Sequence, residues 1–193
     1  MGGGSMNKSP AITIVSGLPR SGTSLMMQML HAGGMPVLTD HIRAPDISNP
    51  RGYFELEAVK QTRLNAAWLL EAPGRAVKMI YRLLYDLPDE YEYRVLFMRR
   101  DLRQVVASQQ AMLGKAGAPD SDNQRLMMIF QKELDAVDAW LIGRKNFAIL
   151  NVPHEQIINH TQRQAEQINA FLNHSLDIAA MCAVVEPALH RRR

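Results

Sequence analysis

Residues 11–24 read AITIVSGLPRSGTS, and this stretch decides the fold class of the chain. It opens with apolar and β-branched residues, which predicts a buried strand that ends at Gly17. Residues 23–31 follow with the pattern of a helix, which Gly33 and Gly34 terminate. A buried strand that turns directly into a helix is typical of an α/β domain with a parallel sheet.

The rest of the chain repeats this alternation of short apolar strands and helices. Further strands are predicted over residues 76–80, 94–98 and 147–152. Further helices are predicted over residues 55–70, after Asp101, from Ser121 to Gly143, and over residues 161–172. The sequence therefore predicts a three-layer α/β/α domain, with a parallel sheet of about four or five strands between layers of helices.

Two of these helices begin with the spacing of a capping box, which satisfies free backbone amides at a helix start. Asp101 and Gln104 have this spacing, and so do Ser121 and Gln124. The second of the two helices also has apolar residues at helical spacing, which predicts one buried face. These residues are Leu126, Ile129, Phe130, Leu134, Val137 and Leu141.

Length and composition describe one globular domain. The 193 residues include 47% hydrophobic and 21% charged residues, which excludes a disordered chain. We interpret residues 1–5, MGGGS, as a remnant of cloning, and residues 6–193 as a single domain.

Charge and cysteine content exclude several classes of protein. The net charge is +3, which the three C-terminal arginines account for, so the sequence argues against a nucleic-acid-binding surface. Cys182 is the only cysteine, so neither an internal disulfide nor a cysteine-based zinc site can form. No apolar run reaches the roughly 18 residues of a membrane span. No leader segment is recognisable, and we therefore expect a cytoplasmic protein without membrane contact.

Residues 17–24, GLPRSGTS, have the spacing of a phosphate-binding loop, in which free amides and a helix dipole face an anion. The G-x-x-x-x-G-K-[ST] pattern of nucleoside triphosphatases is matched except at Thr23, which stands where that pattern has lysine. Arg20, inside the loop, supplies a cation instead. These features predict a P-loop-type domain whose anion site lies at the carboxyl ends of the strands.

The loop sequence PRSGTS resembles the 5′-phosphosulfate loop of sulfotransferases, PxSGT[ST] with lysine or arginine at x. The arginine version is similar to that of tyrosylprotein and many bacterial sulfotransferases. The resemblance implies that the loop binds 3′-phosphoadenosine 5′-phosphosulfate (PAPS) as co-substrate. The residues expected to hold it are Pro19, Arg20, Ser21, Gly22, Thr23 and Ser24.

A second signature of sulfotransferases is an arginine that closes a strand, followed by a serine on the next helix. Arg100 and Ser108, eight residues apart, have this spacing and context, which implies that they hold the 3′-phosphate of PAPS. An arginine suits a phosphate because its planar fork donates two parallel hydrogen bonds and keeps its charge. Arg99 is expected to point to the opposite face of the strand.

Weaker resemblances bear on the reacting groups. Residues 49–55, NPRGYFE, are similar to a stretch of bacterial sulfotransferase-like proteins, and Lys78 resembles a strand lysine that faces the sulfuryl group. Ile80 stands where the cytosolic branch of the family has a catalytic histidine. We therefore predict that Glu55 is the general base. Asp40, His41 and Asp46 are further candidates for this role.

Two further departures from the family pattern bear on the co-substrate. His154 stands where the family usually has tyrosine. The glycine-rich C-terminal segment that covers the 3′-phosphate in the cytosolic branch is not visible in the residues up to Arg193. This second departure bears on the affinity for PAPS.

The resemblance implies an enzyme that transfers a sulfuryl group from PAPS to an acceptor hydroxyl or amine without a metal ion. Arg20, Glu55 and Lys78 are the residues expected to act in the transfer. Two different functions compete with this one: a P-loop nucleotide or small-molecule kinase, against which Thr23 argues, and a non-catalytic nucleotide-binding relative. The unidentified acceptor is expected to bind variable loops, whose composition does not encode a substrate. These loops cover residues 36–53, 81–92 and 113–120.

Overall fold

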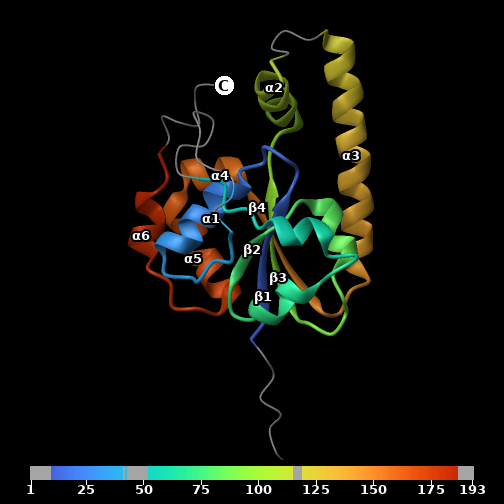
Figure 1. The fold of residues 1–193 in the computed structure, drawn as a ribbon. Helices are drawn as coiled ribbons and strands as arrows, with labels where there is room; N and C mark the ends of the chain where they lie inside the picture. Colours follow the sequence, from blue (N-terminus) through green and yellow to red (C-terminus); the bar gives the residue numbers. More distant parts are fainter. Residues whose placement is uncertain (1–9, 41, 43–51, 115–118, 187–193) are drawn as a thin grey trace, which may run out of the picture.

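The computed structural model describes residues 10–40, 42, 52–114 and 119–186. Within them the chain forms one sheet of four parallel strands in the order β2-β1-β3-β4 (Figure 1). The strands are β1 (Ile12–Gly17), β2 (Ala76–Lys78), β3 (Tyr93–Arg99) and β4 (Phe147–Pro153). The predicted parallel sheet is therefore confirmed. Because the strands are parallel, their carboxyl ends all lie at the same end of the sheet.

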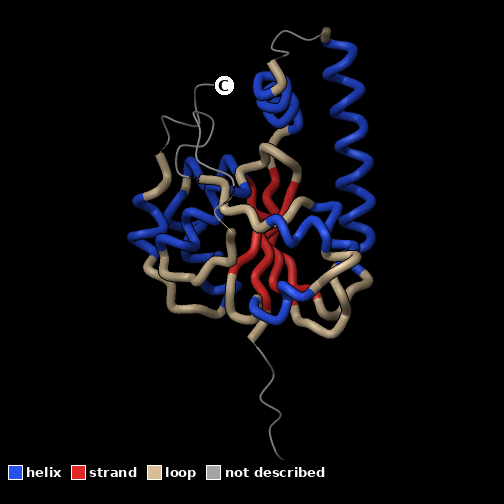
Figure 2. The backbone as a smooth tube through the Cα atoms, viewed as in Figure 1, coloured by secondary structure: helices blue, strands red, loops and turns tan. Residues whose placement is uncertain are grey.

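Helices cover both faces of this sheet, and Figure 2 shows the strands as the middle layer. One face is covered by α1 (Thr23–Ala32), α4 (His154–Asn159), α5 (Thr161–Leu172) and α6 (Ile178–Ala183). The other face is covered by α3 (Asp120–Ile142) and by the 3-10 helices η1 (Glu57–Gln61), η2 (Ala67–Glu71) and η3 (Tyr81–Asp86). The predicted three-layer α/β/α arrangement is confirmed.

Alternating side chains of the strands enter two separate cores. In β3, Val95 and Phe97 enter the core under α3 and the 3-10 helices, whereas Leu96 and Met98 enter the core under α1. Successive residues of a strand point to opposite faces, so a strand that is covered on both faces has to be apolar throughout. For this reason β1, in which every residue is buried, was recognisable from its composition.

The helices α2 (Leu102–Met112) and α3 begin in different ways. Asp101 accepts a hydrogen bond from the amide of Gln104 at 3.1 Å, so the predicted cap of α2 is confirmed. The predicted cap of α3 is wrong, because this helix follows Pro119 directly and Ser121 lies inside its first turn. Proline has a fixed φ and no amide hydrogen to satisfy, so it can precede a helix without a side-chain cap.

The predicted helix over residues 55–70 is also wrong, since η1 and η2 occupy this segment with a turn between them. The side chain of Asn65 accepts a hydrogen bond from the amide of Ala67 at 3.0 Å, which offers the backbone a conformation other than a continuous helix. Trp68 of η2 is buried, and its indole N–H donates to the Thr62 hydroxyl at 3.0 Å.

Elements with longer sequence patterns agree with the predictions. α5 coincides with the helix predicted over residues 161–172, and Gly143 ends α3 as predicted. The elements η3, α4 and α6 were not predicted, because elements of six residues show less than two turns of periodicity. Of the described helices, none is long and apolar enough to cross a membrane. Residues 1–5 and the C-terminal arginines lie outside the described residues.

Candidate active site

The loop between β1 and α1 has a backbone that depends on glycine. Gly17 and Gly22 have φ values of +146° and +101°, and Arg20 between them has a φ of +69°. As the residue that precedes α1, Gly22 has no side chain and makes no capping hydrogen bond. The amides of the first turn and the positive end of the helix dipole are therefore available to an anion.

His154, the first residue of α4, packs directly against this loop. A Cβ atom added at Gly22 would lie 2.5 Å from Cδ2 of His154, so glycine is required there by space as well as by φ. His154 is 4% exposed. This contact was not predicted from the sequence, in which His154 follows a predicted strand and stands where sulfotransferases usually have tyrosine.

The structure brings Arg20, Arg100 and Ser108 together. The Nε of Arg20 donates to the Oγ of Ser108 at 2.9 Å, and the Nη1 of Arg100 donates to the carbonyl oxygen of Arg20 at 3.0 Å. Ser108 is 1% exposed on the face of α2 that contacts the loop. The residues of the two expected phosphate-binding signatures thus border one loop, although they are 80 and 88 residues apart in sequence.

Arg99 points away from this cluster, as the alternation of the strand predicts. Its guanidinium pairs with the carboxylate of Asp138 on α3 and donates to the side-chain oxygen of Asn151 at 2.7 Å. It also lies 4.2 Å from the centroid of the Phe97 ring. Arg99 therefore joins α3 to the sheet and is a structural residue.

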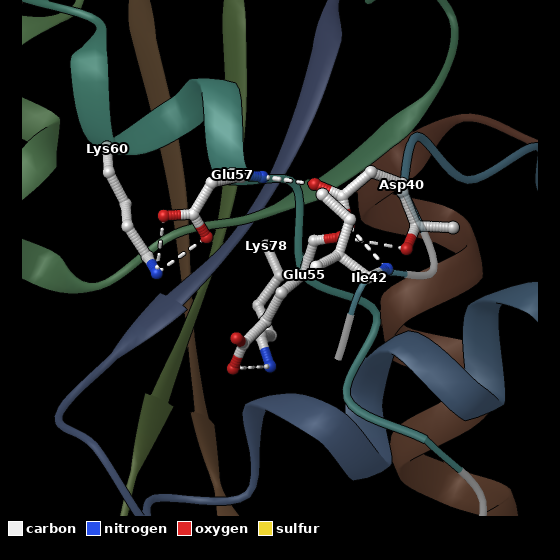
Figure 3. Close-up of polar contacts among 7 residues, drawn as sticks. Asp40, Ile42, Glu55, Glu57, Lys60 and Lys78 are labelled. Carbon is white, nitrogen blue, oxygen red and sulfur yellow. Dashed lines mark hydrogen bonds and ion pairs between the residues drawn. The ribbon is translucent and has the colours of Figure 1, made fainter. Parts of the chain in front are cut away.

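Lys78, at the carboxyl end of β2, contacts two other segments of the chain. Its Nζ is 3.3 Å from Oγ of Ser24 in the first turn of α1, and it donates to the carbonyl oxygen of Tyr53. The same atom is 3.3 Å from Oε1 of Glu55. Figure 3 shows the two side chains pointing toward one another. The predicted base and the predicted cation are therefore in direct contact.

Asp40, also a candidate for the base, has a structural role. Its carboxylate accepts hydrogen bonds from the amides of Ile42 and Glu57, as Figure 3 shows. Its own amide donates to the carbonyl oxygen of Glu55 at 3.1 Å. Asp40 therefore fixes the segment that carries Glu55. His41 and Asp46, the remaining candidates for the base, lie outside the described residues.

Ser21 adds a buried hydroxyl to the loop. The residue is 1% exposed, and its Oγ has no hydrogen-bond partner among the described residues. A buried polar atom without a partner costs about 1–3 kcal/mol, so an acceptor oxygen at this place would stabilise the loop. Pro19 and Thr23 are partly exposed in the same loop.

The arrangement as a whole is suited to an anion. Two arginines, one lysine and the helix amides border the loop, and Glu55 is the carboxylate in contact with the lysine. Such a set of donors binds phosphate or sulfate groups well. In the described ranges, no group of three or more His, Cys, Asp or Glu side chains is placed to hold a metal ion.

Comparison with solved structures identifies domains with a similar fold. No protein-family model and no curated protein matches the chain. The sulfotransferase domain of the Synechococcus PCC 7002 olefin synthase is similar, with a TM-score of 0.55, 14% identity, and coverage of 97% of this chain and 88% of that domain. The sulfotransferase domain from the curacin biosynthetic pathway has a TM-score of 0.52, 14% identity, and coverage of 93% and 79%. The chain therefore has the α/β fold of these sulfotransferase domains.

Proposed function

We propose that the chain is a sulfotransferase, which moves a sulfuryl group from PAPS to a hydroxyl or amine of an acceptor. The observation that carries this proposal is the contact of Arg20 with both Ser108 and Arg100, in a domain with the fold of sulfotransferase domains. Both phosphate-binding signatures of the sequence border one place, at the neighbouring carboxyl ends of β1 and β3.

Arg20 and the amides of Gly22, Thr23 and Ser24 form the proposed site for the 5′-phosphosulfate, whereas the Ser21 amide donates to the carbonyl oxygen of Leu18 at 3.2 Å. The hydrogen bond to Ser108 at 2.9 Å fixes the Arg20 guanidinium beside the loop, and arginine keeps its charge at any working pH. The α1 dipole adds a favourable field for an anion at the same point. The buried Ser21 hydroxyl supplies a further donor within the loop.

Arg100 and Ser108 form the proposed site for the 3′-phosphate. Arg100 directly follows β3, and Ser108 lies in α2, the helix that comes next. The Arg100 guanidinium is oriented by its bonds to the Arg20 carbonyl at 3.0 Å and to Gln104 at 3.1 Å. An arginine held in this way loses less side-chain freedom when it binds a phosphate.

Glu55 is the proposed general base, and Lys78 is a proposed donor to the sulfuryl group. An acceptor hydroxyl has to lose its proton as it attacks, and a carboxylate within hydrogen-bond reach can accept that proton. The contact of Lys78 with Ser24 at 3.3 Å places this pair beside the first turn of α1. Both side chains therefore border the proposed 5′-phosphosulfate site.

The transfer is proposed to need no metal ion. A sulfuryl group carries one negative charge where a γ-phosphate carries up to two, and the growing charge sits on the oxygen between sulfur and the 5′-phosphate. A preorganised donor aimed at such an oxygen is often worth about 2.7–4 kcal/mol. Arg20, Lys78 and the loop amides are donors of this kind. A P-loop kinase relies instead on the loop lysine, whose place Thr23 occupies.

Thermal unfolding with a panel of nucleotides tests the proposal. We expect 3′-phosphoadenosine 5′-phosphate (PAP) at a hundredfold excess over its Kd to raise Tm by about 5–10 °C, since such an excess adds about 2.7 kcal/mol. ATP and GTP at the same concentration should produce smaller shifts. A larger shift with ATP and Mg²⁺ would favour a kinase, and no shift with PAP would contradict the proposal.

A further inference from the structure

The ammonium group of Lys78 lies within hydrogen-bond distance of several acceptors. An ammonium donates three hydrogen bonds, and three acceptors from two segments surround this one, namely Ser24 Oγ in α1 and the Tyr53 carbonyl and Glu55 Oε1 in the segment before η1. The Lys78 and Glu55 side chains are only 11% and 26% exposed, so their attraction is less screened by water than that of a surface pair.

One of these partners belongs to the proposed anion site. Ser24 lies in the first turn of α1, where the helix amides and Arg20 would hold a 5′-phosphosulfate. An anion in this position would lie beside the Lys78 ammonium and would offer it charged oxygens. Such oxygens form stronger hydrogen bonds than a serine hydroxyl does. The anion and the Glu55 carboxylate would then compete for one cation.

We propose that Lys78 is shared between the Glu55 carboxylate and the anion bound at α1, so that binding of the co-substrate releases Glu55 from its ion pair. This inference rests on the proposed function, and it adds a coupling between the two halves of the site. By thermodynamic linkage, the factor by which the Lys78–Glu55 pair weakens anion binding is also the factor by which the bound anion weakens the pair. The pair of Glu55 with Lys78 is thus weakest when the sulfuryl donor is in place.

The backbone of Glu55 itself also has partners other than Lys78. Its carbonyl oxygen accepts hydrogen bonds from the Thr39 hydroxyl at 2.8 Å and from the Asp40 amide at 3.1 Å. The preceding Phe54 has a φ of +52°, a conformation that a bulky residue keeps only when its surroundings impose it. Glu55 therefore stays at the site when Lys78 moves to the anion.

The test measures the affinity for PAP by calorimetry in variants of this pair. Glu55→Gln should tighten PAP binding about threefold to fivefold, the upper range for a partly exposed ion pair, while turnover falls. Glu57→Gln is the matched control, because Glu57 is a nearby acidic residue that pairs with Lys60 at 2.7 Å (Figure 3). This control removes the same charge without touching Lys78, and it should change PAP affinity by less than about twofold.

A second pair of variants separates competition for Lys78 from simple charge repulsion. In a Lys78→Met background, or in Lys78→Gln if the first variant does not fold, Glu55→Gln should leave PAP affinity unchanged. Tightening that persists without Lys78, or a Glu55→Gln variant that binds PAP no better than the parent, would overturn the inference while the proposed function stands. Failure of the unmodified chain to bind PAP would overturn the proposed function and the inference with it.

Discussion

At the scale of single residues, Gly22 meets two constraints at once. Its φ of +101° disfavours any residue with a side chain, and a Cβ atom would collide with the His154 ring at 2.5 Å. Gly34 has a similar φ of +91°, but no heavy atom lies within 4 Å of its Cβ position. These two glycines therefore separate the conformational cost of a side chain from the steric cost.

We predict that Gly22→Ala and Gly34→Ala both lose about 1–2 kcal/mol of unfolding free energy, the usual cost of a left-handed conformation for alanine. Gly22→Ala should lose more than Gly34→Ala, and it alone should weaken PAP binding, because the loop has to shift away from His154. Urea denaturation and calorimetry measure the two effects. Equal losses of stability with unchanged PAP affinity would show that the contact with His154 does not shape the site.

The proposed 3′-phosphate site predicts a change in selectivity. Arg100→Ala should weaken PAP about tenfold to a hundredfold, since a charge-assisted hydrogen bond contributes about 1.5–3 kcal/mol. Adenosine 5′-phosphate, which lacks the 3′-phosphate, should be affected much less. Arg99→Ala is the control, because its partners are Asp138 and Asn151 and it should not change the ratio of the two affinities. Equal weakening of both nucleotides by Arg100→Ala would contradict the assignment.

At the scale of elements, the sequence was sufficient to predict helices of more than two turns and strands that are buried on both faces. The strand β1 and the helix α5 are such elements, whereas η1 and η2 replace a predicted helix because Asn65 bonds its local backbone. The residues of the site likewise include some that the sequence predicts and others that it does not. Arg20, Arg100 and Ser108 belong to local motifs, but the packing of His154 against Gly22 depends on tertiary distances that no local pattern contains.

The cap of α2 predicts a coupling between this element and the site. Asp101→Ala removes the bond to the Gln104 amide and should cost about 1 kcal/mol of unfolding free energy. Since Arg100 and its partner Gln104 lie at this helix start, PAP binding should weaken as well. Asp177→Ala, which removes the equivalent cap bond to Ala180 in α6, should cost the same stability and leave PAP affinity unchanged. Identical PAP affinities in both variants would contradict the coupling.

At the scale of the whole molecule, one hydrophobic core lies on each face of the sheet, and each core joins the sheet to a layer of helices from different parts of the sequence. Tyr93 anchors the core on the side of α3, where its hydroxyl donates to the carbonyl of Pro88 at 2.9 Å. Burial raises the pKa of Tyr93, and nearby Tyr91, Glu90 and Asp89 raise it further. The strand order β2-β1-β3-β4 was not predictable, because the composition of an apolar strand does not indicate which strands it pairs with.

This raised pKa predicts a loss of stability in alkali. The neutral phenol is favoured in the folded state, so its contribution is fully present below the ordinary tyrosine pKa of about 10. It is lost as the pH rises from there through the higher folded value. Tyr93→Phe should cost about 1 kcal/mol at neutral pH, through the lost hydrogen bond, and should flatten the fall in stability above about pH 10. Parallel pH profiles of the two proteins in urea denaturation would contradict this expectation.

In the proposed reaction, hydrogen-bond donors of this chain, rather than a metal ion, stabilise the transfer of the sulfuryl group. The most direct test of this proposal is the rate at which the protein converts PAPS to PAP in excess EDTA, with a simple phenol as acceptor. We expect turnover that EDTA does not reduce and that Arg20→Ala lowers by about a hundredfold or more. No turnover of PAPS, or activity that vanishes with EDTA and returns with Mg²⁺, would contradict the proposal.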